Sequence, residues 1–193
     1  EDKMPGRGNS RAIAEALNGA VDCALEAGFS SLACTPGSLD VAELYAKMGM
    51  ALCDAGIAVW NSKYLYNVIR PIEYVRNVME PGWNTALNNP LNNVKSLTPE
   101  FPAYPSGHSC FGGSGSSVMA EIFGNNTTYT DVCHFGRAEF NSTPRTYQTI
   151  MEAGVENAYS RLPLGVHFRM DCDEGLRLGY LAAARVSALP WHK

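Results

Sequence analysis

Apolar residues recur at helical spacing along the stretch from Ser38 to Ile69, and this periodicity constrains the fold more than any other feature of the sequence. Residues three, four or seven positions apart share one face of an α-helix, and that face carries Val41, Leu44, Met48, Leu52, Ala55 and Val59. Similar patterns predict further helices over residues 10–28, 72–79, 107–123, 147–160 and 167–188. Because strand-like alternation is scarce, we expect an all-α fold, a helical bundle.

The segment from Glu80 to Pro105 interrupts the helical pattern, because it is rich in proline and asparagine. It is predicted to be a long ordered loop or a flexible excursion, and long loops inside compact domains are often functional. Residues 1–193 fit the length of one domain. We interpret them as a single helical domain, either complete or the C-terminal part of a larger chain.

The composition excludes several classes of protein. With 46% hydrophobic residues, the chain has enough apolar side chains for a folded core. The net charge is -4, so the basic surface of a general nucleic-acid-binding protein is missing. No apolar run reaches the roughly 20 residues that a membrane-spanning helix needs. We therefore expect neither a nucleic-acid partner nor a membrane span.

Two cations stand seven residues apart, at Lys63 and Arg70, and Pro71 follows them. Seven residues make about two helical turns, so we expect both cations on one helix face, where they would repel each other unless an anion binds between them. The alternative is that both side chains extend from the helix edge into solvent.

A Pro-Ser-Gly turn precedes the helix predicted from residue 107. The exposed backbone N–H groups at a helix N-terminus bind anions. Ser106 adds a hydroxyl, Gly107 lets a ligand approach the backbone, and His108 can exchange a proton. The alternative is a capping serine beside a surface histidine.

A third group follows the helix predicted over residues 147–160. Pro163 and Gly165 break the helix, so Arg161 and His167 can converge across a turn. Asp171 stands four residues after His167 and can accept its Nδ1–H, which leaves Nε2 free as a nucleophile or ligand. The alternative is an ordinary surface pair. Together the three segments provide cations, a helix N-terminus and two histidines, which suit a tetrahedral oxyanion.

These three motifs resemble the signature of the vanadium-dependent haloperoxidases and the phosphatidic acid phosphatase type 2 superfamily. The matching residues are Lys63-x6-Arg70-Pro71, Pro105-Ser106-Gly107-His108 and Ser160-Arg161-x3-Gly165-x-His167-x3-Asp171. The likeness runs from about Met48 to Gly179, and it implies the helical bundle of this haloperoxidase and acid phosphatase type. Complete members are larger and include helices upstream, so such a region, or an oligomer, could complete this chain.

The resemblance also implies roles for the residues. His167 would bond vanadium through Nε2, and Lys63, Arg70 and Arg161 would neutralise the vanadate oxygens, helped by Ser106 and the N–H of Gly107. His108 would be the acid–base group, and Lys63 would polarise the peroxide. Trp60 and Phe101 match positions that line the halide pocket of chloroperoxidase-like members, although plain core packing also explains them.

The implied reaction is the oxidation of a halide ion by hydrogen peroxide to hypohalous acid, with an organic acceptor as a further candidate partner. Vanadate would be the cofactor, with no haem and no flavin. Chemistry of this kind, together with the cysteines, leads us to expect a secreted or periplasmic protein.

Two other functions use the same residues. A soluble acid phosphatase would use His167 as the nucleophile, through a phosphohistidine intermediate, and His108 as the general acid. A helical scaffold that only binds anions would have no turnover of either kind.

Overall fold

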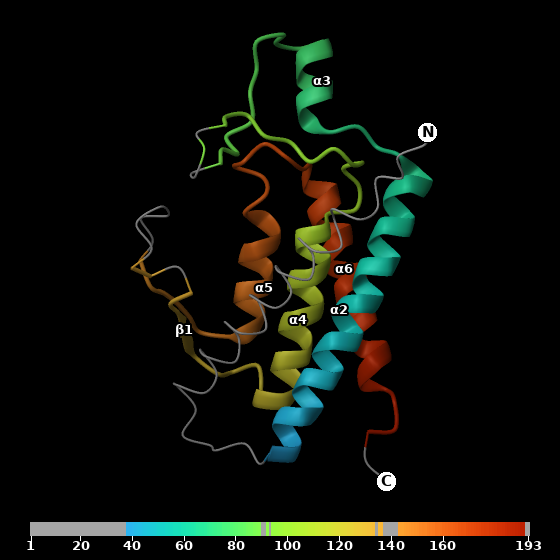
Figure 1. Ribbon diagram of the computed structural model, residues 1–193, viewed down its shortest axis with the longest axis vertical. Helices are drawn as coiled ribbons and strands as arrows, with labels where there is room; N and C mark the ends of the chain where they lie inside the picture. Colours follow the sequence, from blue (N-terminus) through green and yellow to red (C-terminus); the bar gives the residue numbers. More distant parts are fainter. Residues whose placement is uncertain (1–37, 90–91, 93, 134, 137–142, 192–193) are drawn as a thin grey trace.

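The computed structural model describes residues 38–191 except 90–91, 93, 134 and 137–142. Its helices are α2 (Ser38–Tyr66), α3 (Pro71–Val78), α4 (Gly107–Phe123), α5 (Ile150–Tyr159) and α6 (Arg169–Ser187). Helix α4 packs against α2, α5 and α6, and α3 lies apart at one end of the bundle (Figure 1). The prediction of a helical bundle is confirmed, whereas the helix predicted over residues 10–28 lies outside the described residues.

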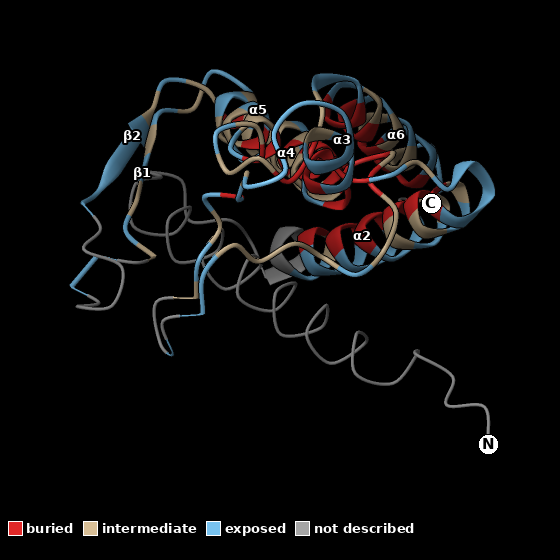
Figure 2. Ribbon diagram, turned by 90° about the horizontal axis from the view of Figure 1, so that it is seen from above, coloured by how far each residue is buried: buried red, intermediate tan, exposed pale blue. Residues whose placement is uncertain are grey.

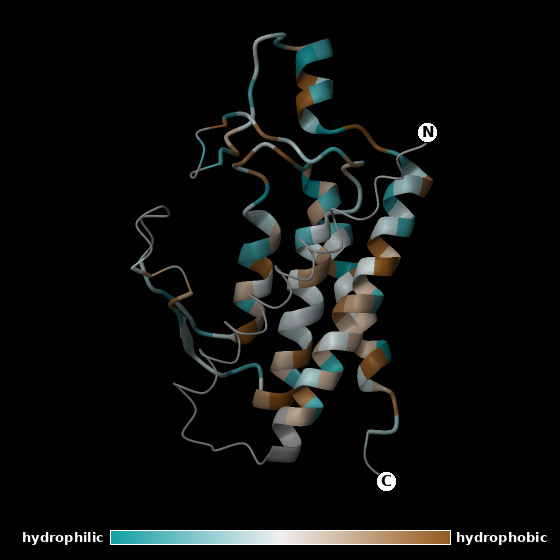
Figure 3. Cartoon of the chain, viewed as in Figure 1, coloured by the Kyte–Doolittle hydropathy of each residue, from teal (hydrophilic) through white to brown (hydrophobic). Residues whose placement is uncertain are grey.

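The core follows the apolar face predicted for α2. Leu44, Met48, Leu52, Ala55 and Val59 are all buried, and Figure 2 shows the buried positions gathered between α2, α4 and α6. Hydrophobic residues recur along α2 (Figure 3). Burial of these side chains holds α2 against α4 and α6, because each Leu, Met or Val contributes roughly 1.5–3 kcal/mol when it leaves water.

One break in the helical pattern comes earlier than predicted. Helix α2 ends at Tyr66 rather than Ile69, and Asn67 has a left-handed backbone with φ 48°, which is typical of a residue just after a helix. Arg70 is extended, as a residue before proline prefers to be, and Pro71 is the first residue of α3. The expectation that Lys63 and Arg70 share one helix face is therefore wrong.

The helices α4 and α6 approach each other through glycines. A Cβ atom built on Gly113 would lie 2.9 Å from the carbonyl oxygen of Leu176, and one built on Gly175 would lie 2.5 Å from that of Ser106. A Cβ on Gly179 would collide with the carbonyl oxygen of Cys110. These glycines form a seam that lets α4 and α6 pack closely, and the seam fixes the start of α4 beside the start of α6.

The segment after α4 contains a small sheet that the sequence pattern did not predict. Strand β1 (Tyr129–Asp131) pairs antiparallel with β2 (Arg145–Tyr147), and the rings of Tyr129 and Tyr147 are 5.3 Å apart. Three-residue strands are too short to give a recognisable alternation. Helix α5 begins at Ile150, later than predicted, because Thr149 caps it by accepting a hydrogen bond from the N–H of Glu152.

The segment from Glu80 to Pro105 is a long loop, as predicted, and it contains no helix or strand among its described residues. Backbone hydrogen bonds hold it to the bundle, including one from Ala103 N–H to the carbonyl of Val68 (2.8 Å). None of the helices in the described part of the chain is long and apolar enough to cross a membrane.

Candidate active site

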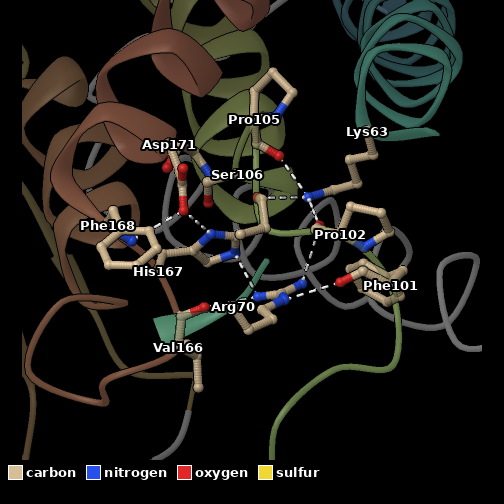
Figure 4. A network of polar contacts seen from close by, with 12 residues as sticks. Lys63, Arg70, Phe101, Pro102, Pro105, Ser106, Val166, His167, Phe168 and Asp171 are labelled. Atoms are coloured by element: carbon tan, nitrogen blue, oxygen red, sulfur yellow. Dashed lines mark hydrogen bonds and ion pairs between the residues drawn. The ribbon is translucent and has the colours of Figure 1, made fainter. Parts of the chain in front are cut away.

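Polar side chains from separate segments converge at the end of the bundle where α4 and α6 begin (Figure 4). They come from the last turn of α2, the residue before α3, the residue before α4, the turn before α6 and the first turn of α6. In that order they are Lys63, Arg70, Ser106, His167 and Asp171. All of them are buried, although buried ionisable groups are rare unless they are paired.

His167 uses both of its ring nitrogens. Nδ1 lies 3.0 Å from Oδ2 of Asp171, and Nε2 lies 3.1 Å from Nη1 of Arg70. Because arginine can only donate, Nε2 accepts, and the proton therefore sits on Nδ1. Burial lowers the pKa of His167 to about 4, with further lowering by Arg70 and Lys63 and an opposing contribution from Asp171. The ring is thus neutral at pH 7, with its Nε2 lone pair directed toward the cations.

Asp171 reaches His167 through the first turn of α6 rather than along one helix face. His167 lies before the helix, and Oδ2 of Asp171 also accepts a hydrogen bond from the N–H of Phe168 (2.9 Å), which caps α6. The predicted contact is therefore present, but the helix predicted from residue 167 begins only at Arg169, so His167 lies outside it. Because the backbone N–H of Ser106 donates to the carbonyl of Asp171 (2.8 Å), the same residue also ties α4 to α6.

Arg70 is held by backbone carbonyl groups from both sides of the site. Its Nε donates to Phe101 (2.9 Å) and its Nη1 donates to Val166 (2.7 Å). Burial lowers the pKa of Arg70 to about 10, partly offset by the negative charge of Asp171. The guanidinium therefore stays charged at neutral pH and remains fixed beside His167.

Lys63 donates to three backbone carbonyl groups, those of Pro102 and Ala103 at 2.9 Å each and that of Pro105 at 2.5 Å. These bonds use all three protons of the ammonium group. Burial, and then repulsion by Arg70, lowers the pKa of Lys63 to about 7. In this arrangement Lys63 contributes positive charge to the site, while its N–H groups are directed at the backbone.

Arg161 contributes a buried guanidinium whose Nε has no hydrogen-bond partner among the described residues. Burial lowers the pKa of this side chain. An unpaired buried donor costs about 1–3 kcal/mol, and an anion in the site would satisfy it. Arg161 thus provides an unused donor within the converging group of cations.

Ser106 and Gly107 form the N-terminus of α4, with the hydroxyl of Ser106 accepting from the N–H of Ser109 (3.3 Å). His108 follows and is exposed to solvent. Desolvation, and then the positive charges of Arg161, Arg70 and Lys63, lowers the pKa of His108 to about 3. His108 is therefore neutral at pH 7 and lies within the field of these three cations.

Trp60 and Phe101 form an aromatic wall beside the cations. Their ring centroids are 5.2 Å apart, and the indole of Trp60 would lie 3.2 Å from a Cβ atom on Gly107. The Phe101 ring also lies 5.3 Å from Nζ of Lys63 and 5.1 Å from Cζ of Arg70. Apolar rings thus lie beside the N-terminus of α4.

Two features of the site escaped the sequence pattern. The carbonyl groups of residues 101–105 orient Lys63 and Arg70. Every residue has a backbone carbonyl group, so the sequence does not show which ones accept these hydrogen bonds. Phe111 lies behind Trp60, with ring centroids 6.1 Å apart, and its place one helical turn after Gly107 is the signal that could have identified it.

The described residues contain no group of three or more His, Cys, Asp and Glu side chains of the kind that holds a metal cation. The donors that do converge are guanidinium, ammonium, imidazole and helix N–H groups. This set suits an anion, and a tetrahedral oxyanion attached to one imidazole nitrogen matches both its charge and its donors.

Comparison with known proteins gives the family. The family model of the VCPO second helical-bundle domain matches residues 43–189. The chain belongs to this vanadium haloperoxidase family. The resemblance stated from the three motifs is thereby confirmed, as is the helical-bundle fold.

Two curated haloperoxidases are similar to this chain. Vanadium chloroperoxidase of Curvularia inaequalis is 30% identical over 172 residues, covering 68% of this chain and 28% of that protein. Vanadium-dependent bromoperoxidase of Ascophyllum nodosum is 29% identical over 117 residues, covering 52% of this chain and 21% of that protein. The chain thus spans less than a third of the length of either haloperoxidase.

Solved structures of bacterial members of the family give the same result. A vanadium-dependent iodoperoxidase superposes with a TM-score of 0.66 at 30% identity, covering 77% of this chain and 33% of that chain. A holo-type vanadium-dependent chloroperoxidase superposes with a TM-score of 0.52 at 16% identity, covering 96% of this chain and 50% of that chain. The second likeness shows the haloperoxidase fold alone.

Proposed function

We propose that this chain holds vanadate at the convergence of Lys63, Arg70, Arg161 and His167 and oxidises halide ions with hydrogen peroxide. The observation that carries the proposal is the site itself. Buried cations surround a neutral imidazole, and a buried N–H of Arg161 has no partner among the described residues. A trivalent oxyanion would offset the repulsion among these cations and accept the unused N–H.

Each residue has a role that follows from its position. His167 offers the Nε2 lone pair, and Asp171 keeps the ring proton on Nδ1. Arg70 and Arg161 donate to the oxyanion, Lys63 adds charge, and the N-terminus of α4 at Ser106 and Gly107 adds backbone N–H groups. When bound, vanadate supplies Lewis-acid activation of peroxide.

His108 is the proposed acid–base group. It is neutral at pH 7, so it would be free to take up a proton from hydrogen peroxide when vanadate is bound. Because it is exposed, it can exchange that proton with solvent. The nearby cations Arg161, Arg70 and Lys63 disfavour protonated His108, so His108 would release the proton readily.

Trp60 and Phe101 are the proposed halide pocket. Apolar rings exclude water from a weakly hydrated anion, while Lys63 and Arg70 stand within 6 Å of these rings and supply positive charge. The similar proteins include a chloroperoxidase, a bromoperoxidase and an iodoperoxidase. Substrates for this chain are therefore to be tested as a panel, with a phenol as the organic acceptor.

The test combines binding with turnover. The full chain is titrated with orthovanadate by calorimetry, then assayed with hydrogen peroxide and chloride, bromide or iodide. We expect binding, and oxidation of at least one halide, and we expect both to be lost in His167→Ala. Failure of the wild-type chain to bind orthovanadate would overturn the proposal. Hydrolysis of a phosphate ester without halide oxidation would replace it with the acid phosphatase.

We also propose a secreted or periplasmic location. Cys133 is disulfide-bonded, and disulfides persist mainly in oxidising compartments. Alkylation of the purified, unfolded chain checks this: Cys133 should react only after reduction, whereas Cys53, Cys110 and Cys172 are free thiols and should react at once.

A further inference from the structure

The turn between Arg161 and His167 is covered by Trp83 from the long loop after α3. Gly165 in this turn has φ 71°, a backbone conformation that favours glycine. A Cβ atom on Gly165 would lie 2.6 Å from Cη2 and 2.9 Å from Cζ2 of Trp83. The indole therefore lies directly on the Cα atom of Gly165.

The same turn fixes two groups of the proposed vanadate site. Inside the turn, Gly165 N–H donates to the carbonyl of Leu162 (2.9 Å) and Val166 N–H donates to that of Arg161 (3.3 Å). The carbonyl of Val166 accepts from Nη1 of Arg70. Opening the turn would therefore shift Arg161, His167 and an anchor of Arg70 together.

Trp83 is itself held in place by α3 and by the turn. Nε of Arg76, in the last turn of α3, donates to the carbonyl of Trp83 (2.7 Å), and Nη2 of Arg76 donates to Oδ1 of Asn84 (2.7 Å). Three residues after Trp83, the N–H of Ala86 donates to the carbonyl of Leu164 (3.0 Å). The loop is thus fastened on both sides of the indole.

We propose that Trp83 is a positioning residue, whose indole presses on Gly165 and holds the turn that places Arg161 and His167 for the oxyanion. This inference rests on the proposed function, because it assigns the turn to the vanadate site. Loss of a residue that orients ligands from outside commonly costs roughly 10–100-fold in affinity. The long loop is then part of the binding machinery, not only a connection between helices.

The experiment compares Trp83→Ala and Trp83→Phe with a matched control, Trp191→Ala. Trp191 lies after the far end of α6, where its Nε1 donates to the carbonyl of Val186. Two quantities are measured on the full chain. One is the hydrogen exchange of the Gly165 and Val166 amides without ligand, and the other is the dissociation constant for orthovanadate.

We expect Trp83→Ala to speed exchange of both amides and to weaken orthovanadate binding by about tenfold or more. Trp83→Phe keeps an aromatic ring on Gly165 and should restore much of both. Trp191→Ala should lower the melting temperature without changing either quantity. If Trp83→Ala does not fold, Gly165→Ala decides, because its methyl group would collide with the indole of Trp83.

A double-mutant cycle tests the contact itself. Gly165→Ala collides with the indole, so its effect on exchange should shrink in the Trp83→Ala background. Unchanged exchange and unchanged affinity in Trp83→Ala would overturn the inference. A wild-type chain that does not bind orthovanadate would overturn the proposed function instead, and the exchange measurement would still decide whether Trp83 holds the turn.

Discussion

The guanidinium of Arg70 donates to Nε2 of His167 over 3.1 Å, on the side of the ring opposite the Asp171 contact. A ligand that bonds to Nε2 must take the place of this N–H. Arg70 also donates to the carbonyl groups of Phe101 and Val166, which hold its guanidinium in place, so the freed N–H would become available to the oxygens of the ligand. Arg70 and His167 therefore form a preformed site, in which an N–H of Arg70 occupies the Nε2 atom that would bind the ligand.

Removal of this donor should change the titration of His167. In Arg70→Met the repulsion between the guanidinium and the imidazolium disappears, so the pKa of His167 should rise above its value of about 4. It should stay below 6.5, because burial, the larger cause, remains. An NMR titration of the imidazole signals measures the shift. An unchanged pKa would contradict the assigned contact.

Asp171 should matter far more than its neighbour Asp173 on the same helix. Asp171→Ala leaves the Nδ1–H of His167 and the N–H of Phe168 without their acceptor in a buried place, at a cost of about 1–3 kcal/mol for an unpaired group. Orthovanadate affinity should fall roughly 10–100-fold. Asp173→Ala removes only exposed contacts, a hydrogen bond from the hydroxyl of Tyr159 and an ion pair with Arg169, and should cost less than about 1 kcal/mol. Urea unfolding and calorimetry measure both.

Stability should fall as the pH is lowered from 6.5 toward 4. Burial holds the pKa of His167 at about 4, whereas an unfolded histidine titrates near 6.5. Between these values the unfolded chain binds a proton that the folded chain does not, so the free energy of unfolding decreases with falling pH. In His167→Asn this dependence should be shallower. Equal slopes for the two proteins in urea unfolding at several pH values would exclude His167 as a cause.

The charge of Lys63 should make anion binding pH-dependent. Burial lowers the pKa of Lys63 to about 7, so the ammonium loses its proton as the pH rises above that value and the site loses positive charge. Orthovanadate affinity should then decrease more steeply with pH in the wild type than in Lys63→Met, which has nothing to titrate there. Vanadate itself changes protonation over this pH range, but it does so equally for both proteins. The difference between their affinity curves therefore reports Lys63 alone. Parallel curves would show that Lys63 does not titrate in this range.

Two glycine substitutions should have opposite effects. Gly179→Ala would drive a methyl group into the backbone of α4 at Cys110, and overpacking of this kind costs typically 1–3 kcal/mol. Gly49→Ala, in the exposed part of α2, meets no atom within 4 Å and should stabilise the helix by about 0.5–1 kcal/mol. Thermal unfolding measures both. Tolerance of Gly179→Ala would contradict the close approach of α4 and α6.

The helices and the core were predictable because their causes are local. The apolar face of α2 has a helical period, and Pro71 must begin rather than continue a helix. The small sheet was not predictable, since its pairing joins residues 129–131 to residues 145–147 across a polar segment. Its strands are too short to be recognised by alternation alone.

The candidate site was predictable in its members but not in its geometry. The charges of Lys63, Arg70 and Arg161 stand out in an apolar chain, and the spacing of His167 and Asp171 permits their contact. The sequence placed Lys63 and Arg70 on one helix, whereas α2 ends between them. The path of residues 101–105 decides which carbonyl groups accept hydrogen bonds from Lys63 and Arg70. Residue types alone do not reveal that path.

The glycine seam between α4 and α6 divides the site into a fixed half and an adjustable half. Ser106 and Asp171 lie at helix starts whose backbones touch, and His167 lies just before α6, so the backbone spacing of these residues is fixed. Trp60 and Lys63 belong to α2, which contacts these helices through side chains that can be exchanged. If the proposed function holds, halide selectivity can be engineered on α2 by replacing Trp60, without disturbing His167.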